Sequence, residues 1–112
     1  MIKRALLFLE AGEFYNAGRY IEQAINQDAE NSKVHFIKLM FKRGAHNADE
    51  LINNFDTPLG NGKLFQRAIN FADEAYKSEL ESYVQWVHDR IDKTLAERAA
   101  EQERIQAERE KI

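Results

Sequence analysis

Apolar residues recur at intervals of three and four along most of this chain, which is the period of an amphipathic α-helix. The spacing predicts helices over residues 2–11, 13–27, 32–43 and 63–76, followed by a long last helix. The third of these is apolar nearly all round, which is typical of a helix that lies between neighbours. The pattern therefore predicts an all-α protein.

Turn-forming and capping residues separate the predicted helices. Gly12 and Gly44 are expected to end the helices before them, because glycine adopts the left-handed conformation of a helix stop at little cost. Ser32 is a candidate cap for the third helix. Ser78 and Glu81 have the spacing of a capping box and are expected to begin the last helix.

Residues 44–62 do not follow the pattern, and they contain the single proline of the chain. Residues 48–54 are expected to form two helical turns with Leu51 and Ile52 facing inward, and Phe55 is expected to help hold this stretch against the third or fourth helix. The turn-rich run 56–62 has few apolar atoms to anchor it. We expect early proteolytic cuts at 56–63 and after Leu95.

The last helix changes character along its length. Residues at helical spacing supply an apolar face in its first half: Leu80, Val84, Val87, Ile91 and Leu95. Trp86 lies beside them and is expected to pack between helices, with a binding anchor as the alternative. Residues 96–112 are mostly Ala, Glu, Arg and Gln. We expect them to form a charged helical extension or tail beyond a domain at 1–95.

Two of the helices share one pattern of small and large residues, displaced by 51 positions. Phe14, Ala17, Ile21 and Ala24 correspond to Phe65, Ala68, Ala72 and Ala75. A tetratricopeptide unit has about 34 residues, and the excess is close to the length of the irregular stretch 44–62. The pattern therefore suggests two helix pairs, with an insertion at about 44–62 in the second.

The first thirty residues resemble one tetratricopeptide repeat, and the whole chain is similar to bacterial tetratricopeptide-type proteins of unassigned function. The positions that carry the resemblance are Ala5, Phe8, Gly12, Phe14, Ala17, Ala24 and Asp28. Ala29 replaces the usual proline, and His35 stands where the second repeat usually has a large aromatic residue. The resemblance implies a right-handed stack of antiparallel helix pairs, closed by a long C-terminal capping helix.

In the tetratricopeptide family the first helix of each repeat lines a concave groove that binds other proteins. By position, this resemblance places six residues in such a groove: Lys3, Leu6, Glu10, Phe36, Met40 and Arg43. A groove that mixes apolar and charged side chains suits a peptide or helix of a partner protein. Ile2, Leu6 and Phe36 replace the Lys and Asn of the clamp with which some co-chaperones bind C-terminal carboxylates, so chaperone tails are not the expected ligand. The alternative is a homo-oligomer that assembles through residues 80–112.

Composition and motifs indicate a binding protein and not an enzyme. The formal net charge is −3 and there is no cysteine, which excludes disulfides and argues against a nucleic-acid binder. No apolar run is long enough for a membrane span, and no leader pattern is visible, so a cytoplasmic location is expected. His35, His46 and His88 lack the spacing of a metal site. The run Gly60 to Lys63 lacks the other residues of a phosphate loop. We therefore expect no catalytic residue, metal or cofactor.

Overall fold

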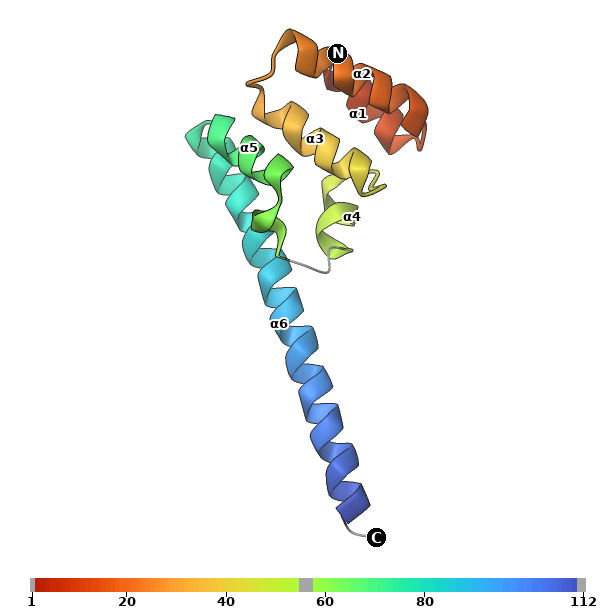
Figure 1. The fold of residues 1–112 in the computed structure, drawn as a ribbon, viewed down its shortest axis with the longest axis vertical. Helices are drawn as coiled ribbons and strands as arrows, with labels where there is room; N and C mark the ends of the chain where they lie inside the picture. The colour runs from red at the N-terminus through yellow and green to blue at the C-terminus, as the bar shows by residue number, and fades with distance from the viewer. Residues whose placement is uncertain (1, 55–57, 111–112) are drawn as a thin grey trace.

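The computed structural model describes residues 2–54 and 58–110. Within these ranges the chain forms six α-helices and one short 3-10 helix, and no β-strand. The predicted all-α class is therefore confirmed (Figure 1).

The first three helices follow one another through short turns and pack together. They are α1 (Ile2–Glu10), α2 (Phe14–Gln27) and α3 (Ser32–Lys42). Each of them contacts the other two. The turn between α1 and α2 is tight because Gly12 adopts a φ of 80°, as predicted. Because each turn reverses the chain, α1 and α3 run in the same direction with α2 antiparallel to both (Figure 1).

Small residues allow α2 to pack closely, and α3 is enclosed by its neighbours. Ala17 is 0% exposed and Ala24 is 6% exposed, so both face the interior. Side chains around most of α3 are buried, in agreement with its apolar sequence: Val34, His35, Phe36, Ile37, Leu39 and Met40.

The cap of α3 differs from the prediction. Asn31 is the N-cap, and its Oδ1 accepts hydrogen bonds from the backbone N–H groups of Lys33 at 3.0 Å and Val34 at 3.4 Å. Ser32 is the first residue of the helix. Its hydroxyl donates to the backbone carbonyl of Ala68 at 2.5 Å and so links α3 to the helix beside it.

The irregular stretch after α3 contains α4 (Ala48–Asn53) and a 3-10 helix, η1 (Leu59–Asn61). Leu51 and Ile52 are buried, as predicted. Leu59 is also buried, at 1% exposure, so one of the few apolar residues of the turn-rich run anchors it to the body. Phe55 and the start of that run, residues 56–57, lie outside the described residues.

α5 (Lys63–Phe71) packs against α3 and is shorter than predicted. Ala72 is extended, with φ −77° and ψ 144°, and α6 (Glu74–Glu110) begins two residues later. Asp73 precedes α6 and caps its start, since its Oδ1 accepts from the backbone N–H of Tyr76 at 2.8 Å. The helix predicted over 63–76 therefore begins as predicted but ends at Phe71, and the helix start predicted at the Ser78 capping box is wrong.

This break also limits the internal repeat. Ala17 and Ala68 are both 0% exposed and occupy equivalent buried positions. Ala24 is buried, whereas Ala75 is exposed because it lies in the first turn of α6. The 51-residue correspondence therefore holds through Ala68 and fails at its last two pairs, because Ala72 is extended beyond the end of α5.

α6 has 37 residues and belongs to the helical body only in its first half. Leu80 and Val87 are 0% exposed, whereas every residue from 92 to 110 is exposed. This second half projects from the body and gives the molecule its elongated shape, with extents of 66 × 31 × 18 Å (Figure 1).

Candidate interaction groove

One groove runs between α1 and α6 across the surface of α3. We call it the α1–α3–α6 groove. Its lining residues come from these three helices and from the start of α4: Ile2, Lys3, Leu6, Glu10, Lys33, Phe36, Ile37, Met40, Asn47, Ala48, Tyr76, Glu79 and Tyr83. The groove thus joins parts of the chain that lie far apart in sequence.

Five of the six residues predicted to bind a partner line this groove: Lys3, Leu6, Glu10, Phe36 and Met40. Arg43 does not. It is the C-cap residue of α3 and lines a different hollow with Glu50, Leu51 and Asn54. The chain turns at Gly44, with φ 69°, immediately after Arg43, and α4 then occupies the space beyond the end of α3.

The lining residues differ in how much of them is accessible. Phe36 and Met40 are 4% and 3% exposed, so they form the floor of the groove. The prediction that they are exposed in the groove is therefore wrong. Ile2 and Leu6 on α1 are half-buried, and Lys3 and Glu10 are exposed. Apolar contact with a ligand would therefore come from the walls more than from the floor.

The wall on α6 is aromatic, and sequence reasoning missed it. The ring of Tyr83 stacks on Phe36 with centroids 5.7 Å apart and an interplanar angle of 17°. The Lys33 ammonium lies 5.7 Å from the centroid of the Tyr76 ring. Tyr76 and Tyr83 are seven positions apart, which places them on one face of a helix. That spacing was the available signal, but the predicted helix boundary separated the two residues.

Burial and a neighbouring carboxylate raise the pKa of both tyrosines. The Tyr83 hydroxyl donates to Glu79 Oε1 at 2.8 Å. Burial, this hydrogen bond and the charges of Glu79 and Asp49 raise the pKa of Tyr83 to about 12. Burial, followed by the charge of Glu79, also raises the pKa of Tyr76. Both hydroxyl groups therefore stay protonated, and can donate hydrogen bonds, further into the alkaline range than the hydroxyl of a free tyrosine.

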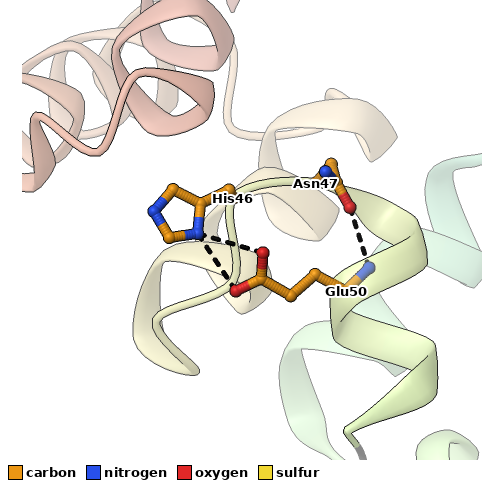
Figure 2. A network of polar contacts seen from close by, with 3 residues as sticks. All are labelled: His46, Asn47 and Glu50. Atoms are coloured by element: carbon orange, nitrogen blue, oxygen red, sulfur yellow. Dashed lines mark hydrogen bonds and ion pairs between the residues drawn. The ribbon is translucent and has the colours of Figure 1, made fainter.

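The start of α4 forms one end of the groove and is held by local polar contacts (Figure 2). Asn47 Oδ1 accepts from the backbone N–H of Glu50 at 2.8 Å and caps the helix. His46 Nδ1 lies 3.0 Å from both oxygens of the Glu50 carboxylate. The His46 ring also packs edge-on against Phe14, with centroids 5.3 Å apart. These contacts attach the beginning of α4 to the start of α2.

The other two histidines have contacts of their own. His35 is 5% exposed, donates from Nε2 to the Ala29 carbonyl at 2.6 Å and stacks on Phe71. His88 is exposed and lies 3.3 Å from Asp92, one turn further along α6. No group of three or more His, Asp or Glu side chains that could hold a metal ion occurs in the described parts of the chain.

Trp86 is not buried, contrary to the preferred prediction. It is 56% exposed on α6, and its indole N–H donates to Asn53 Oδ1 at 3.2 Å. Arg90, one turn later, donates to the Asn53 carbonyl. Trp86 and Arg90 thereby tie the end of α4 to α6.

The seam proposed for self-assembly is largely used within the chain. Leu80 and Val87 are fully buried against the rest of the body. On the projecting half of α6, the large apolar residues are Leu95 and Ile105, which are 57% and 40% exposed. The large apolar side chains that α6 leaves exposed are therefore separated along the helix: Trp86, Leu95 and Ile105.

The chain matches no protein-family model, no curated protein and no solved structure. In the part of the chain that the structure describes, no helix combines the length and apolar character needed to cross a membrane. The geometry of the α1–α3–α6 groove is therefore the basis for assigning a function.

Proposed function

We propose that this chain is a protein-interaction scaffold of the tetratricopeptide type, and that its α1–α3–α6 groove binds a peptide or helix of a partner protein. In this proposal α1 and α2 form the first helix pair and α3 and α5 the second, in a right-handed stack. α6 covers the second pair, and α4 with η1 is an insertion within it. The scaffold would act in the cytoplasm.

The single observation that carries the proposal is the composition of the groove. Half-buried apolar side chains of α1 and aromatic rings of α6 face one another across a closed apolar floor on α3, with lysine and glutamate at the rim. Interfaces of this kind combine apolar anchors with a polar rim. Tyrosine in particular provides contact area with little conformational freedom to lose.

The directions of the three helices support the tetratricopeptide assignment. α1 and α3 run in the same direction. Two contacts indicate that α6 also runs in the same direction as α3. Lys33 lies over Tyr76 near the start of both helices, and Phe36 stacks on Tyr83 further along both. In this proposal α6 corresponds to the first helix of a third pair, parallel to α3.

Site-specific photo-crosslinking tests the proposal, with two adjacent leucines of α1 as a matched pair. Leu6 lines the groove, whereas Leu7 is 63% exposed and lies outside its lining. A photoreactive phenylalanine at position 6, in cells of the source organism, is expected to give a discrete protein adduct. The same group at position 7 is expected to give none. Equal labelling at both positions, or none at position 6, would contradict the proposal.

Point variants provide an independent check of the same groove. Leu6→Glu is expected to abolish binding of the partner that crosslinking identifies, because it places a charge on the apolar wall. Leu7→Glu is expected to leave the interaction unchanged. Circular dichroism of both variants distinguishes lost binding from lost folding.

A further inference from the structure

The α1–α3–α6 groove has charged side chains of opposite sign at its two ends. Lys3 and Lys33 are the second residues of α1 and α3, so they lie together at the end where these parallel helices begin. Glu10 is the last residue of α1 and lies at the opposite end, beside Asn47 and Ala48 of the α4 start. We call these the lysine end and the glutamate end.

The helix dipoles add to this difference. The N-termini of α1 and α3 face the lysine end, and an N-terminus carries a partial positive charge. The C-terminus of α1 faces the glutamate end and carries a partial negative charge. Backbone and side chains therefore produce the same sign of potential at the lysine end. At the glutamate end the start of α4 opposes the C-terminus of α1, so the carboxylates there determine the sign.

α6 adds a second carboxylate on the groove wall between the two ends. Glu79 lies one turn beyond Tyr76 and is held by the hydroxyl of Tyr83 at 2.8 Å. Asp49 of α4 is close enough to raise the pKa of Tyr83 by its charge. Glu10, Asp49 and Glu79 together thus make the glutamate end and the adjacent α6 wall acidic.

We propose that the α1–α3–α6 groove orients its ligand by charge: the bound segment of the partner has an apolar centre between an acidic side chain at the lysine end and a basic side chain at the glutamate end. The inference rests on the proposed function and specifies the partner. Such a segment places its apolar residue against Ile2, Leu6 and the tyrosine wall.

Complementary charge at the two ends determines orientation more than it adds affinity. Charges at the rim of an interface steer association and disfavour the wrong register, because like charges brought together repel. A segment bound in the reverse orientation would place its basic residue against Lys3 and Lys33. Its acidic residue would meet Glu10 and Glu79.

The test uses the full chain and a synthetic helical peptide with an aspartate at one end, a central leucine and phenylalanine, and an arginine at the other end. A nitroxide spin label is attached beside either the aspartate or the arginine. Binding is followed through the methyl signals of Leu6 and Met40. Orientation is followed by the paramagnetic broadening of amide signals at Lys3 and Lys33, compared with Glu10 and Asn47.

The label beside the aspartate is expected to broaden the lysine end, and the label beside the arginine the glutamate end. The mixed-charge peptide is expected to bind about fivefold more tightly than peptides with two aspartates or two arginines, because exposed ion pairs are individually weak. Charge reversal at four positions, by Lys3→Glu, Lys33→Glu, Glu10→Lys and Glu79→Lys, is expected to exchange the two broadening patterns. Lys38→Glu is the matched control, since Lys38 pairs with Glu22 and does not line the groove.

The outcomes separate this inference from the function on which it rests. Methyl shifts at Leu6 with equal broadening at both ends would overturn the charge-orientation inference and leave the binding function in place. The absence of methyl shifts with all three peptides would contradict both.

Discussion

At the residue scale, neighbouring polar side chains have different roles that depend on what lies near them. Asn31 and Ser32 are adjacent at the start of α3. Asn31 caps the helix, and Ser32 forms a hydrogen bond to the Ala68 carbonyl of α5. Both residue types are common at helix N-termini, and the difference between them here arises because α5 places an acceptor next to the Ser32 hydroxyl.

We predict that Asn31→Ala lowers the free energy of unfolding by about 1 kcal/mol, because the backbone N–H groups of Lys33 and Val34 lose their acceptor. Urea denaturation followed by circular dichroism measures the change. Asn31→Asp keeps the acceptor and is expected to restore most of the stability. Equal stability of the alanine and aspartate variants would contradict the assignment of Asn31 as the cap.

Tyr76 and Tyr83 are predicted to make the fold sensitive to alkaline pH. An unfolded tyrosine has a pKa of about 10, whereas the pKa of Tyr83 in the folded chain is about 12 and that of Tyr76 is also raised. The folded state therefore binds these protons more tightly. This contribution to stability is complete below about pH 10. It is lost as the pH rises through the raised pKa values.

Urea midpoints measured at a series of pH values from neutral to strongly alkaline provide the test. In the double variant Tyr76→Phe and Tyr83→Phe, the decline above about pH 10 is expected to be smaller than in the unaltered chain. Tyr15→Phe is the control, because Tyr15 is 80% exposed. An identical decline in the double variant and the control would show that Tyr76 and Tyr83 do not cause it.

At the element scale, α5 and α6 show how a capping side chain divides a helix-forming sequence. Residues 63–76 have helical spacing, yet the helix stops at Phe71 and a new one starts at Glu74. Asp73 stabilises the new start through Tyr76 N–H. The break lets α6 change direction and bring Tyr76 and Tyr83 to the groove.

We predict that Asp73→Ala destabilises the fold by about 1 kcal/mol, the usual effect of removing an N-cap. Ser78→Ala is expected to cost nothing or to stabilise slightly, because Ser78 is exposed inside α6 and alanine has the higher helix propensity. Thermal or urea unfolding distinguishes the two variants. A larger loss for Ser78→Ala than for Asp73→Ala would support a helix start at the capping box instead.

The two halves of α6 are predicted to contribute very differently to stability. Leu80→Ala should lower the free energy of unfolding by about 2–5 kcal/mol, because it removes buried methyl groups and leaves a cavity. Deletion of residues 96–112 should change it by less than about 0.5 kcal/mol, since residues 96–110 are all exposed. A large loss of stability on deletion would mean that the projecting half makes contacts within the folded chain.

At the scale of the whole molecule, the projecting half of α6 dominates the shape. The radius of gyration of the Cα atoms is 18.3 Å, whereas a compact domain of this length would have about 13 Å. The groove lies in the helical body, between α1 and the first half of α6. Binding in the groove and extension of α6 are therefore separable properties.

We predict that the chain is a monomer in solution, with a radius of gyration close to 18.3 Å. Deletion of residues 96–112 should lower this value towards about 13 Å without changing the number of chains. Small-angle scattering and light scattering on both lengths test the two expectations. A molecular mass of two chains that falls to the mass of one chain on deletion would instead support assembly through α6.

The sequence by itself determined the number and type of the main elements. The spacing of apolar residues and the glycines at 12 and 44 predict α1, α2, α3 and α4 to within a residue or so at each end. Helix formation and helix stops depend on contacts within a few residues, so local sequence carries this information. The two alanines of α2, Ala17 and Ala24, belong to its periodic apolar face, and both are buried.

Only the tertiary structure decided which side chains meet. The stack of Tyr83 on Phe36 joins residues 47 positions apart in sequence, and no local pattern specifies that contact. The same holds for the exposure of Trp86, for the burial of Phe36 and Met40 in the groove floor, and for the place of Arg43 outside the groove. Whether a side chain is buried depends on which element packs against it. In this protein the directions of α4 and α6 determine that packing.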